Sequence, residues 1–171
     1  MMKPFPVKLV VPCIISKDFP LDKAIIELKN KFSKIDFESE TISFNHTDYY
    51  YKEMGQPLYR KFYSFKNLVN PGELADIKNT TCRIENKFSI NGKRTINLDP
   101  GYIEPSKFVL ASTKNFYHRI YIGKGIFAEV TLVWRKDNYQ ILPWTFPDYS
   151  TKKYRKILKS IREIYMKQIK Q

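Results

Sequence analysis

The chain has 171 residues, of which 43% are hydrophobic and 15% aromatic, a composition that excludes a disordered chain. Its net charge of +13 attracts polyanions such as nucleic acid, although most of the basic residues are lysines and an AT-rich genome would impose the same bias. Cys13 and Cys82 are far apart, and only His46 and His118 could accompany them. We therefore expect neither a zinc site nor a disulfide framework.

The sequence also argues against a membrane protein. Its N-terminal apolar run is broken by Lys8 and Pro12 and lacks a small-residue cleavage site, which indicates a buried strand and not a signal peptide. No apolar run reaches the roughly 18 residues that a membrane-spanning helix needs. The expectation is a cytoplasmic protein without membrane contact.

The N-terminal third predicts a β-α-β opening. Residues 6–16 form an apolar strand, residues 20–34 carry apolar side chains at helical spacing, and residues 36–46 return as a strand. The segment 47–55 contains three consecutive tyrosines beside Glu53 and predicts a short helix or turn. These tyrosines either pack against the core or stack on bases, and packing is the commoner role.

Residues 58–65 alternate basic and aromatic side chains, with Arg60 on one face of the predicted strand and Lys61 on the other. This pattern is consistent with a sheet that binds single-stranded nucleic acid. It is equally consistent with long side chains that cover the core.

A second helix begins at Asn70-Pro71, because Asn is a preferred N-cap, Pro fits the first helical position, and Glu73 completes a capping box. An apolar seam along this helix faces the core. Lys78 and Glu85 flank the seam two turns apart. They either point at whatever lies at the edge of the sheet or are solvated, and solvation is the commoner role.

Residues 94–99 alternate as a short strand that stops at Pro100-Gly101. Proline cannot continue a ladder and glycine adopts a positive φ at little cost, so Asp99 is expected at a strand end that faces a turn. There it either caps the turn or is presented to a ligand.

Two β-rich runs around Gly125 predict an antiparallel hairpin. With a three-residue loop, Ile122 faces Ile126 and Arg119 faces Glu129. This charged pair is either an ordinary cross-strand pair or part of a pocket whose floor is the sheet. A slip of one residue would separate the two side chains.

His118 lies on the opposite face in this register, beside Ile120 and Ile122, and is expected to be a half-buried imidazole. It is also a candidate catalytic base. A scheme that pairs it with Glu129 needs another register or a bulge.

The C-terminal part predicts a rigid, irregular segment at 143–149 and a final helix that begins after Ser150 or Thr151. Residues 151–171 contain eight basic residues and one acidic residue, a surplus of +7. The basic side of this amphipathic helix is the best predicted nucleic-acid surface, although a solvated lysine face is also common.

Together these elements predict one α+β domain over residues 1–171. We expect a mainly antiparallel or mixed sheet and about three helices, the last of them basic and amphipathic.

Four motifs in order, TDYYYKEMG, RTINLDPGYI, HRIYIGKGIFAEV and WTFPDY, resemble a bacterial family known as domain of unknown function 4416. The resemblance covers nearly the whole chain and implies no established activity. Members are sometimes labelled GTP-binding, but this chain has no G-x-x-x-x-G-K-S/T loop to hold phosphates. The resemblance implies these first candidates for a site: Glu53, Asn97, Asp99, Arg119, Glu129 and Asp148.

Two functions remain open. The first is a pocket for a phosphorylated or nucleotide-like anion, gripped by Arg94, Lys114 or Arg119. Asp99 or Glu129 would then serve as a base or as a ligand of a divalent metal. Acidic residues within basic motifs favour this hypothesis, and whether the protein is an enzyme stays open, as do its cofactor and oligomeric state.

The second function is RNA or ribonucleoprotein binding. The basic residues that would contact phosphates are Lys152, Lys156 and Lys159 on the last helix, with Arg60 and Lys61 on the basic-aromatic strand.

Overall fold

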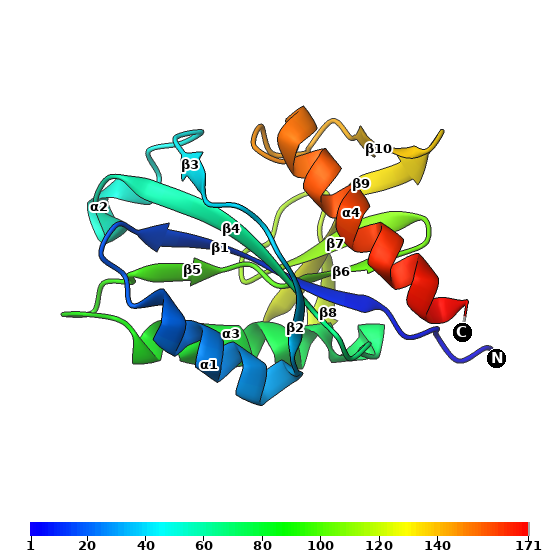
Figure 1. The fold of residues 1–171 in the computed structure, drawn as a ribbon, viewed down its shortest axis with the longest axis horizontal. Helices are drawn as coiled ribbons and strands as arrows, with labels where there is room; N and C mark the ends of the chain where they lie inside the picture. Colours follow the sequence, from blue (N-terminus) through cyan, green and yellow to red (C-terminus); the bar gives the residue numbers. More distant parts are fainter. Residues whose placement is uncertain (171) are drawn as a thin grey trace.

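A computed structural model describes residues 1–170, in which a ten-stranded antiparallel sheet carries helices on both faces (Figure 1). The predicted α+β fold class is confirmed. The strands are β1 (Lys8–Ser16), β2 (Ile35–Glu38), β3 (Ile42–Phe44), β4 (Leu58–Phe65), β5 (Ile96–Leu98), β6 (Gly101–Glu104), β7 (Lys107–Ser112), β8 (Ile120–Gly123), β9 (Ile126–Arg135) and β10 (Asn138–Ile141). The helices are α1 (Leu21–Phe32), α2 (Tyr51–Met54), α3 (Leu74–Lys87) and α4 (Lys152–Ile169), with a 3₁₀ turn at Pro71–Glu73. In the described part of the chain, no helix is both long and apolar enough to cross a membrane.

The main path through the sheet is β10-β9-β7-β6-β1-β4-β2, while β3, β5 and β8 pair with β4, β1 and β9. Both strands of the predicted β-α-β opening pair with β4, which lies between them. The single strand predicted over residues 36–46 is instead two short strands, β2 and β3. They separate because residues 39–41 lie opposite only residues 61–62 of β4, so the register shifts by one residue.

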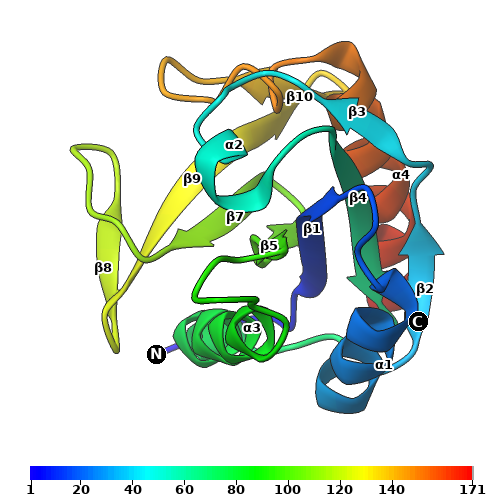
Figure 2. The same ribbon diagram turned by 90° about the vertical axis from the view of Figure 1, so that its left-hand side faces the viewer.

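Alternate side chains of the central strands pack into two hydrophobic cores, one on each face of the sheet. In β1, Leu9 and Val11 pack with α1 and α3, whereas Val10 packs on the side of α4. Figures 1 and 2 show α1 and α3 beneath one face and α4 across the other. In β4, Phe62 packs on the α4 side and Tyr63 on the other side. The interpretation of this strand as an open surface for single-stranded nucleic acid is therefore wrong.

The chain passes through Asp99 and Pro100 without turning, because β5 and β6 both pair with β1 in the same direction. The turn predicted at Pro100-Gly101 is wrong, since the proline interrupts the ladder and does not reverse the chain. Gly101 serves close packing and not a positive φ: a Cβ at this position would lie 2.2 Å from the carbonyl oxygen of Val109.

The hairpin of β8 and β9 is confirmed, but its loop has two residues. Gly123, and not Ile122, pairs with Ile126, and Ile122 lies at the register shift in β8. Lys124 and Gly125 form the loop with φ values of 55° and 77°, as a two-residue turn with two positive φ angles requires. The hairpin extends along one edge of the molecule (Figure 2).

The two predicted helix starts are confirmed. Asn70 accepts a hydrogen bond from the Gly72 N–H, and Glu73 completes the capping box. At α4, the hydroxyl of Thr151 accepts from the Tyr154 N–H. Both caps use side chains within three residues, which explains why the sequence alone predicted them.

Candidate functional site

A cavity of about 750 Å³ lies where the α2 region, β4, β5, the end of β7 and the segment before α4 meet. The charged side chains that line it are Arg60, Lys78, Arg94, Lys114, Arg119, Asp99, Glu129 and Asp148. Of the predicted catalytic and ligand-binding residues, only Glu53 and His118 do not line the cavity, and both contact residues that do. A concave site with convergent polar groups is typical of ligand binding.

Arg60 of β4 is almost wholly buried in the cavity wall, with a side chain that is 3% exposed. Its Nη2 donates to Asp148 Oδ2 at 3.0 Å, and its Nε lies 3.4 Å from the Tyr154 hydroxyl. Its Nη1 has no hydrogen-bond partner among residues 1–170, and an Asp99 carboxylate oxygen lies 3.7 Å from it. Burial opposes the charge, but nearby tyrosines and carboxylates hold the pKa of Arg60 above its usual value. The wall therefore contains a permanent cation with one unused donor.

Tyr149 brings a second unused donor to this wall. The residue is 3% exposed, and its hydroxyl has no partner in the described part of the chain. Burial raises the pKa of Tyr149, so the hydroxyl stays protonated. Its backbone N–H donates to Asp148 Oδ1 at 2.9 Å, so both oxygens of Asp148 are engaged within the protein. Asp148 thus orients the Arg60 guanidinium and holds the backbone N–H of Tyr149 in place.

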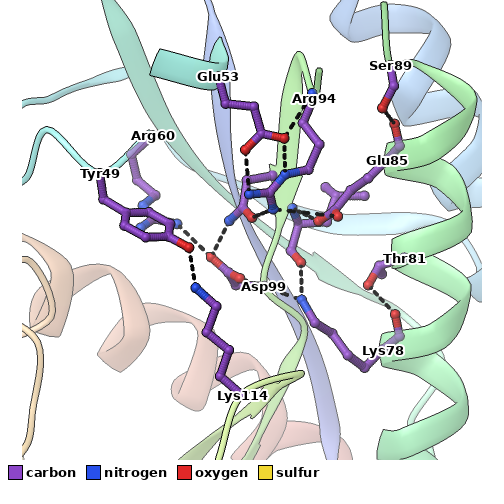
Figure 3. Close-up of polar contacts among 12 residues, drawn as sticks. Tyr49, Glu53, Arg60, Lys78, Thr81, Glu85, Ser89, Arg94, Asp99 and Lys114 are labelled. Carbon is purple, nitrogen blue, oxygen red and sulfur yellow. Dashed lines mark hydrogen bonds and ion pairs between the residues drawn. The ribbon is translucent and has the colours of Figure 1, made fainter. Parts of the chain in front are cut away.

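A chain of hydrogen bonds ends on Asp99 (Figure 3). Glu53 of α2 accepts from Arg94 Nε at 2.9 Å and from Nη2 at 2.8 Å, and these bonds lower the pKa of Glu53. Arg94 Nη1 donates to Asn97 Oδ1 at 2.7 Å, and Asn97 Nδ2 donates to Asp99 Oδ2 at 2.7 Å. Because the arginine can only donate, it fixes the orientation of the amide. One of the two Asp99 oxygens therefore accepts a hydrogen bond from an Asn97 amide whose orientation is already fixed.

Lys78 and Glu85 of α3 are each 5% exposed, so the prediction that they are solvated is wrong. Lys78 Nζ donates to the Leu98 carbonyl at 2.8 Å and lies 3.7 Å from Asp99 Oδ1. Glu85 accepts from the Leu98 N–H at 2.6 Å, and burial raises its pKa. The two side chains satisfy the backbone of β5 on its α3 side, and buried backbone groups require such partners.

Glu129 of β9 anchors a second polar corner of the cavity. Its Oε2 accepts from Arg119 Nε at 2.8 Å and lies 2.7 Å from His118 Nε2. Its Oε1 accepts from the Thr131 hydroxyl at 3.2 Å. The His118 ring stacks on Trp144 with centroids 5.4 Å apart. The expectation that His118 lies on the opposite face from Glu129 is wrong, because His118 precedes β8 and is free of the strand alternation.

The rim of the cavity carries Lys114 and Tyr49. The Lys114 ammonium contacts the Tyr49 hydroxyl and lies 4.4 Å from the centre of its ring. Figure 3 shows the two side chains beside Asp99. Among residues 1–170, Lys114 forms no ion pair with a carboxylate, so it is an available cation at the entrance.

The candidate nucleic-acid residues do not form one surface. Arg60 is buried in the cavity wall, contrary to the prediction, and Lys61 is 12% exposed and paired with a glutamate of β2. Lys159 of α4 donates to a carbonyl oxygen in the β9–β10 turn at 3.0 Å. Lys152 and Lys156 are exposed on the same helix.

Sequence reasoning missed Lys78 and Tyr149 as residues of the cavity, and it left open whether Arg60 contacts nucleic acid or covers the core. The alternation of β4 contained a usable signal, because it put Arg60 on the same face as the apolar Phe62. No local pattern marked Tyr149. Within residues 1–170, no group of three or more His, Cys, Asp and Glu side chains is arranged to hold a metal ion.

The model of a family described as "Domain of unknown function (DUF4416)" matches residues 5–165 of the chain. Neither a comparison with curated proteins nor one with solved structures found a match.

Proposed function

The chain belongs to the DUF4416 family, and we propose that its cavity binds a small anionic ligand, such as a phosphorylated or nucleotide-like compound. The observation that carries this proposal is the unused Nη1 donor of Arg60. A buried donor without a partner destabilises the folded protein by about 1–3 kcal/mol. A hydrogen bond to an anionic oxygen is stronger than one between two neutral groups. The nitrogen is itself buried, so side chains of the wall must move for an anionic oxygen to reach it and satisfy the donor.

Three further features support an anion site. The Tyr149 hydroxyl adds a second unused donor to the same wall. Lys78 supplies positive charge in the interior and Lys114 at the rim. If the ligand is also transformed, Asp99 and Glu129 are the carboxylates available as a general base or as ligands of a divalent metal.

The test is a thermal-shift titration with inorganic phosphate, adenosine monophosphate and glycerol 3-phosphate at about 0.3 M KCl, where surface electrostatics are screened. A ligand that binds only the folded protein raises Tm in a saturable way. Tyr149→Phe should weaken this stabilisation, because it removes one donor and leaves the rest of the wall intact.

Tyr139→Phe is the matched control. Tyr139 is fully buried and its hydroxyl is also without a partner among the described residues, but it does not line the cavity. This variant should bind as the unmodified protein does. Equal loss in both variants, or no anion that raises Tm, would reject the proposal.

RNA binding is a second candidate, favoured by the exposed Lys152 and Lys156 on α4. It predicts that the log of the affinity for a labelled RNA falls steeply with the log of the salt concentration. Replacing these two lysines by alanine should reduce that slope, and Tyr149→Phe should leave it unchanged. A slope that the double variant does not alter would reject RNA binding by this helix.

A further inference from the structure

We infer that the ligand of this cavity carries a hydroxyl group within a few bonds of its anionic group, and that Asp99 Oδ1 accepts a hydrogen bond from that hydroxyl. The inference rests on the proposed function and specifies the class of ligand. It depends on one carboxylate, its fixed orientation and its distances to Arg60 and Lys78.

Asp99 has one oxygen that is used and one that is available. Its Oδ2 accepts from Asn97 Nδ2 at 2.7 Å. In the described part of the chain, no hydrogen bond reaches Oδ1; the Lys78 ammonium is 3.7 Å away and donates to a backbone carbonyl. The side chain is 26% exposed and lines the cavity. An ionised carboxylate accepts several hydrogen bonds, so Oδ1 is an acceptor that awaits a donor.

The position of this acceptor is determined by its neighbours. Glu53, Arg94 and Asn97 form a chain in which each hydrogen bond fixes the next group. Figure 3 shows Asp99 between the ends of Arg60, Lys78 and Lys114. Asp99 thus lies at the centre of the polar groups, and a ligand bound to Arg60 must also meet Asp99.

The separation of Arg60 from Asp99 keeps the two groups of the ligand close together. Arg60 Nη1 lies 3.7 Å from Asp99 Oδ2, and the available Oδ1 is the other oxygen of the same carboxylate. An anionic oxygen bound to Nη1 therefore lies next to a carboxylate, and two like charges at that distance repel each other. A hydroxyl on a nearby atom of the ligand offsets this repulsion, because it donates to Asp99 Oδ1 while the anionic oxygen accepts from Arg60.

The charges around Asp99 favour a neutral donor. An ammonium group at this position would approach the Lys78 ammonium, which lies 3.7 Å from the same carboxylate oxygen. A hydroxyl also donates a hydrogen bond to the carboxylate, and it adds no positive charge. Two compound classes supply a hydroxyl within a few bonds of an anionic oxygen: 2-hydroxycarboxylates, and phosphate monoesters of vicinal diols.

The experiment compares probes that differ by that hydroxyl. Affinities are measured by isothermal titration for L-malate against succinate, and for 2-hydroxypropyl phosphate against propyl phosphate. A hydrogen bond to a charged acceptor makes the hydroxylated member of the matching pair bind roughly ten- to a hundredfold more tightly. The pair that shows this ratio identifies the anionic group.

Asp99→Ala should reduce the ratio to about one while anion binding persists or becomes tighter, since the variant removes both the acceptor and a negative charge that repels the anion. Asn97→Ser leaves the Asp99 carboxylate in place without its fixed partner, so it should reduce the ratio in part. This second variant keeps the test valid if Asp99→Ala is unstable. Thermal unfolding of both variants checks that they are folded.

The outcomes separate the two proposals. If anions bind in a way that depends on Tyr149 but the hydroxyl makes no difference, the inference about Asp99 is overturned and the proposed function stands. A ratio that survives in Asp99→Ala also overturns the inference. If no probe binds, or Tyr149→Phe has no effect on binding, the proposed function is overturned and the inference with it.

Discussion

The cavity wall around Arg60 and the basic face of α4 both carry positive charge, but they use it differently. Arg60 is buried, and one of its nitrogens lacks a partner among residues 1–170. On α4, Arg162 donates to the carbonyl oxygen of Pro105 at 2.8 Å and lies 3.9 Å from the ring of Trp134. Lys159 is likewise engaged with a carbonyl oxygen. The helix thus uses several cations to fasten itself to the sheet.

Net charge is therefore a poor guide to which cations lack a partner within the protein. Water and salt screen the exposed cations of α4, so each contributes little to stability or affinity. In the cavity wall, water is excluded and an unused donor has a real energetic cost. We therefore expect substitutions in the two regions to change the free energy of unfolding by different amounts, and often in opposite directions.

The largest effect is expected for Arg60→Met. The variant leaves the Asp148 carboxylate buried without its guanidinium partner, which should reduce the free energy of unfolding by about 3–5 kcal/mol. Urea denaturation measures the loss. Adding Asp148→Asn should restore part of it, because the buried charge is then gone. Unchanged stability in Arg60→Met would show that the buried ion pair does not hold this wall.

Tyr149→Phe and Tyr139→Phe should each raise the free energy of unfolding, by roughly 1 kcal/mol, because each removes a buried hydroxyl without a partner. Urea denaturation without added anions tests this. In that case Tyr149→Phe stabilises the ligand-free protein and at the same time weakens anion binding. A loss of stability in Tyr149→Phe would indicate that its hydroxyl is satisfied in solution.

Two carboxylates lie near Arg94, Glu53 at 2.8 Å from Nη2 and Glu85 at 3.9 Å from Nη1, and they should respond to pH in opposite directions. Glu53 has a lowered pKa, so its contribution to stability is present above its unfolded pKa of about 4.3 and is lost as the pH falls through its folded value. Glu53→Gln should therefore be less stable than the unmodified protein at neutral pH and equal to it in acid.

Glu85 has a raised pKa because it is buried, so ionisation costs stability as the pH rises from about 4.3 through the folded value. Glu85→Gln should be more stable at neutral pH, and the difference should vanish in acid. Urea denaturation of both variants between pH 3 and pH 7 measures the two trends. Parallel curves for the two variants would contradict the assigned pKa directions.

The smallest effects are expected on α4. Lys156→Ala should change the free energy of unfolding by less than about 0.5 kcal/mol, since the side chain is exposed. Arg162→Ala should cost about 1 kcal/mol, because it removes the contact with Trp134 and two hydrogen bonds to Pro105. Thermal unfolding distinguishes the two. An equal loss in both would mean that the exposed lysine also fastens the helix.

Much of the fold was predictable because its signals are local. Asn70 and Thr151 cap their helices through neighbours within three residues, and the alternation in β1 and β4 marked both strands. The chain direction at Pro100 was not predictable in this way. Proline and glycine favour a turn there, but pairing of β5 and β6 with β1 keeps the chain extended.

The site was predictable only as a set of residue types. The motifs drew attention to Asp99, Glu129 and Arg94, and the structure places all three on one cavity. They did not indicate that His118 would reach Glu129, since that contact depends on His118 lying outside the strand alternation.

The positions of the main helices, the class of the fold and a set of candidate polar residues could be predicted from the sequence, because periodicity, caps and side-chain chemistry act within a few residues. Which charged side chains have hydrogen-bonding or ionic partners depends on the tertiary structure. Arg60 and Asp148 are 88 positions apart in the chain, and their contact depends on how β4 and the segment before α4 pack. Whether a buried donor has a partner is a property of that packing, and a local pattern does not contain it.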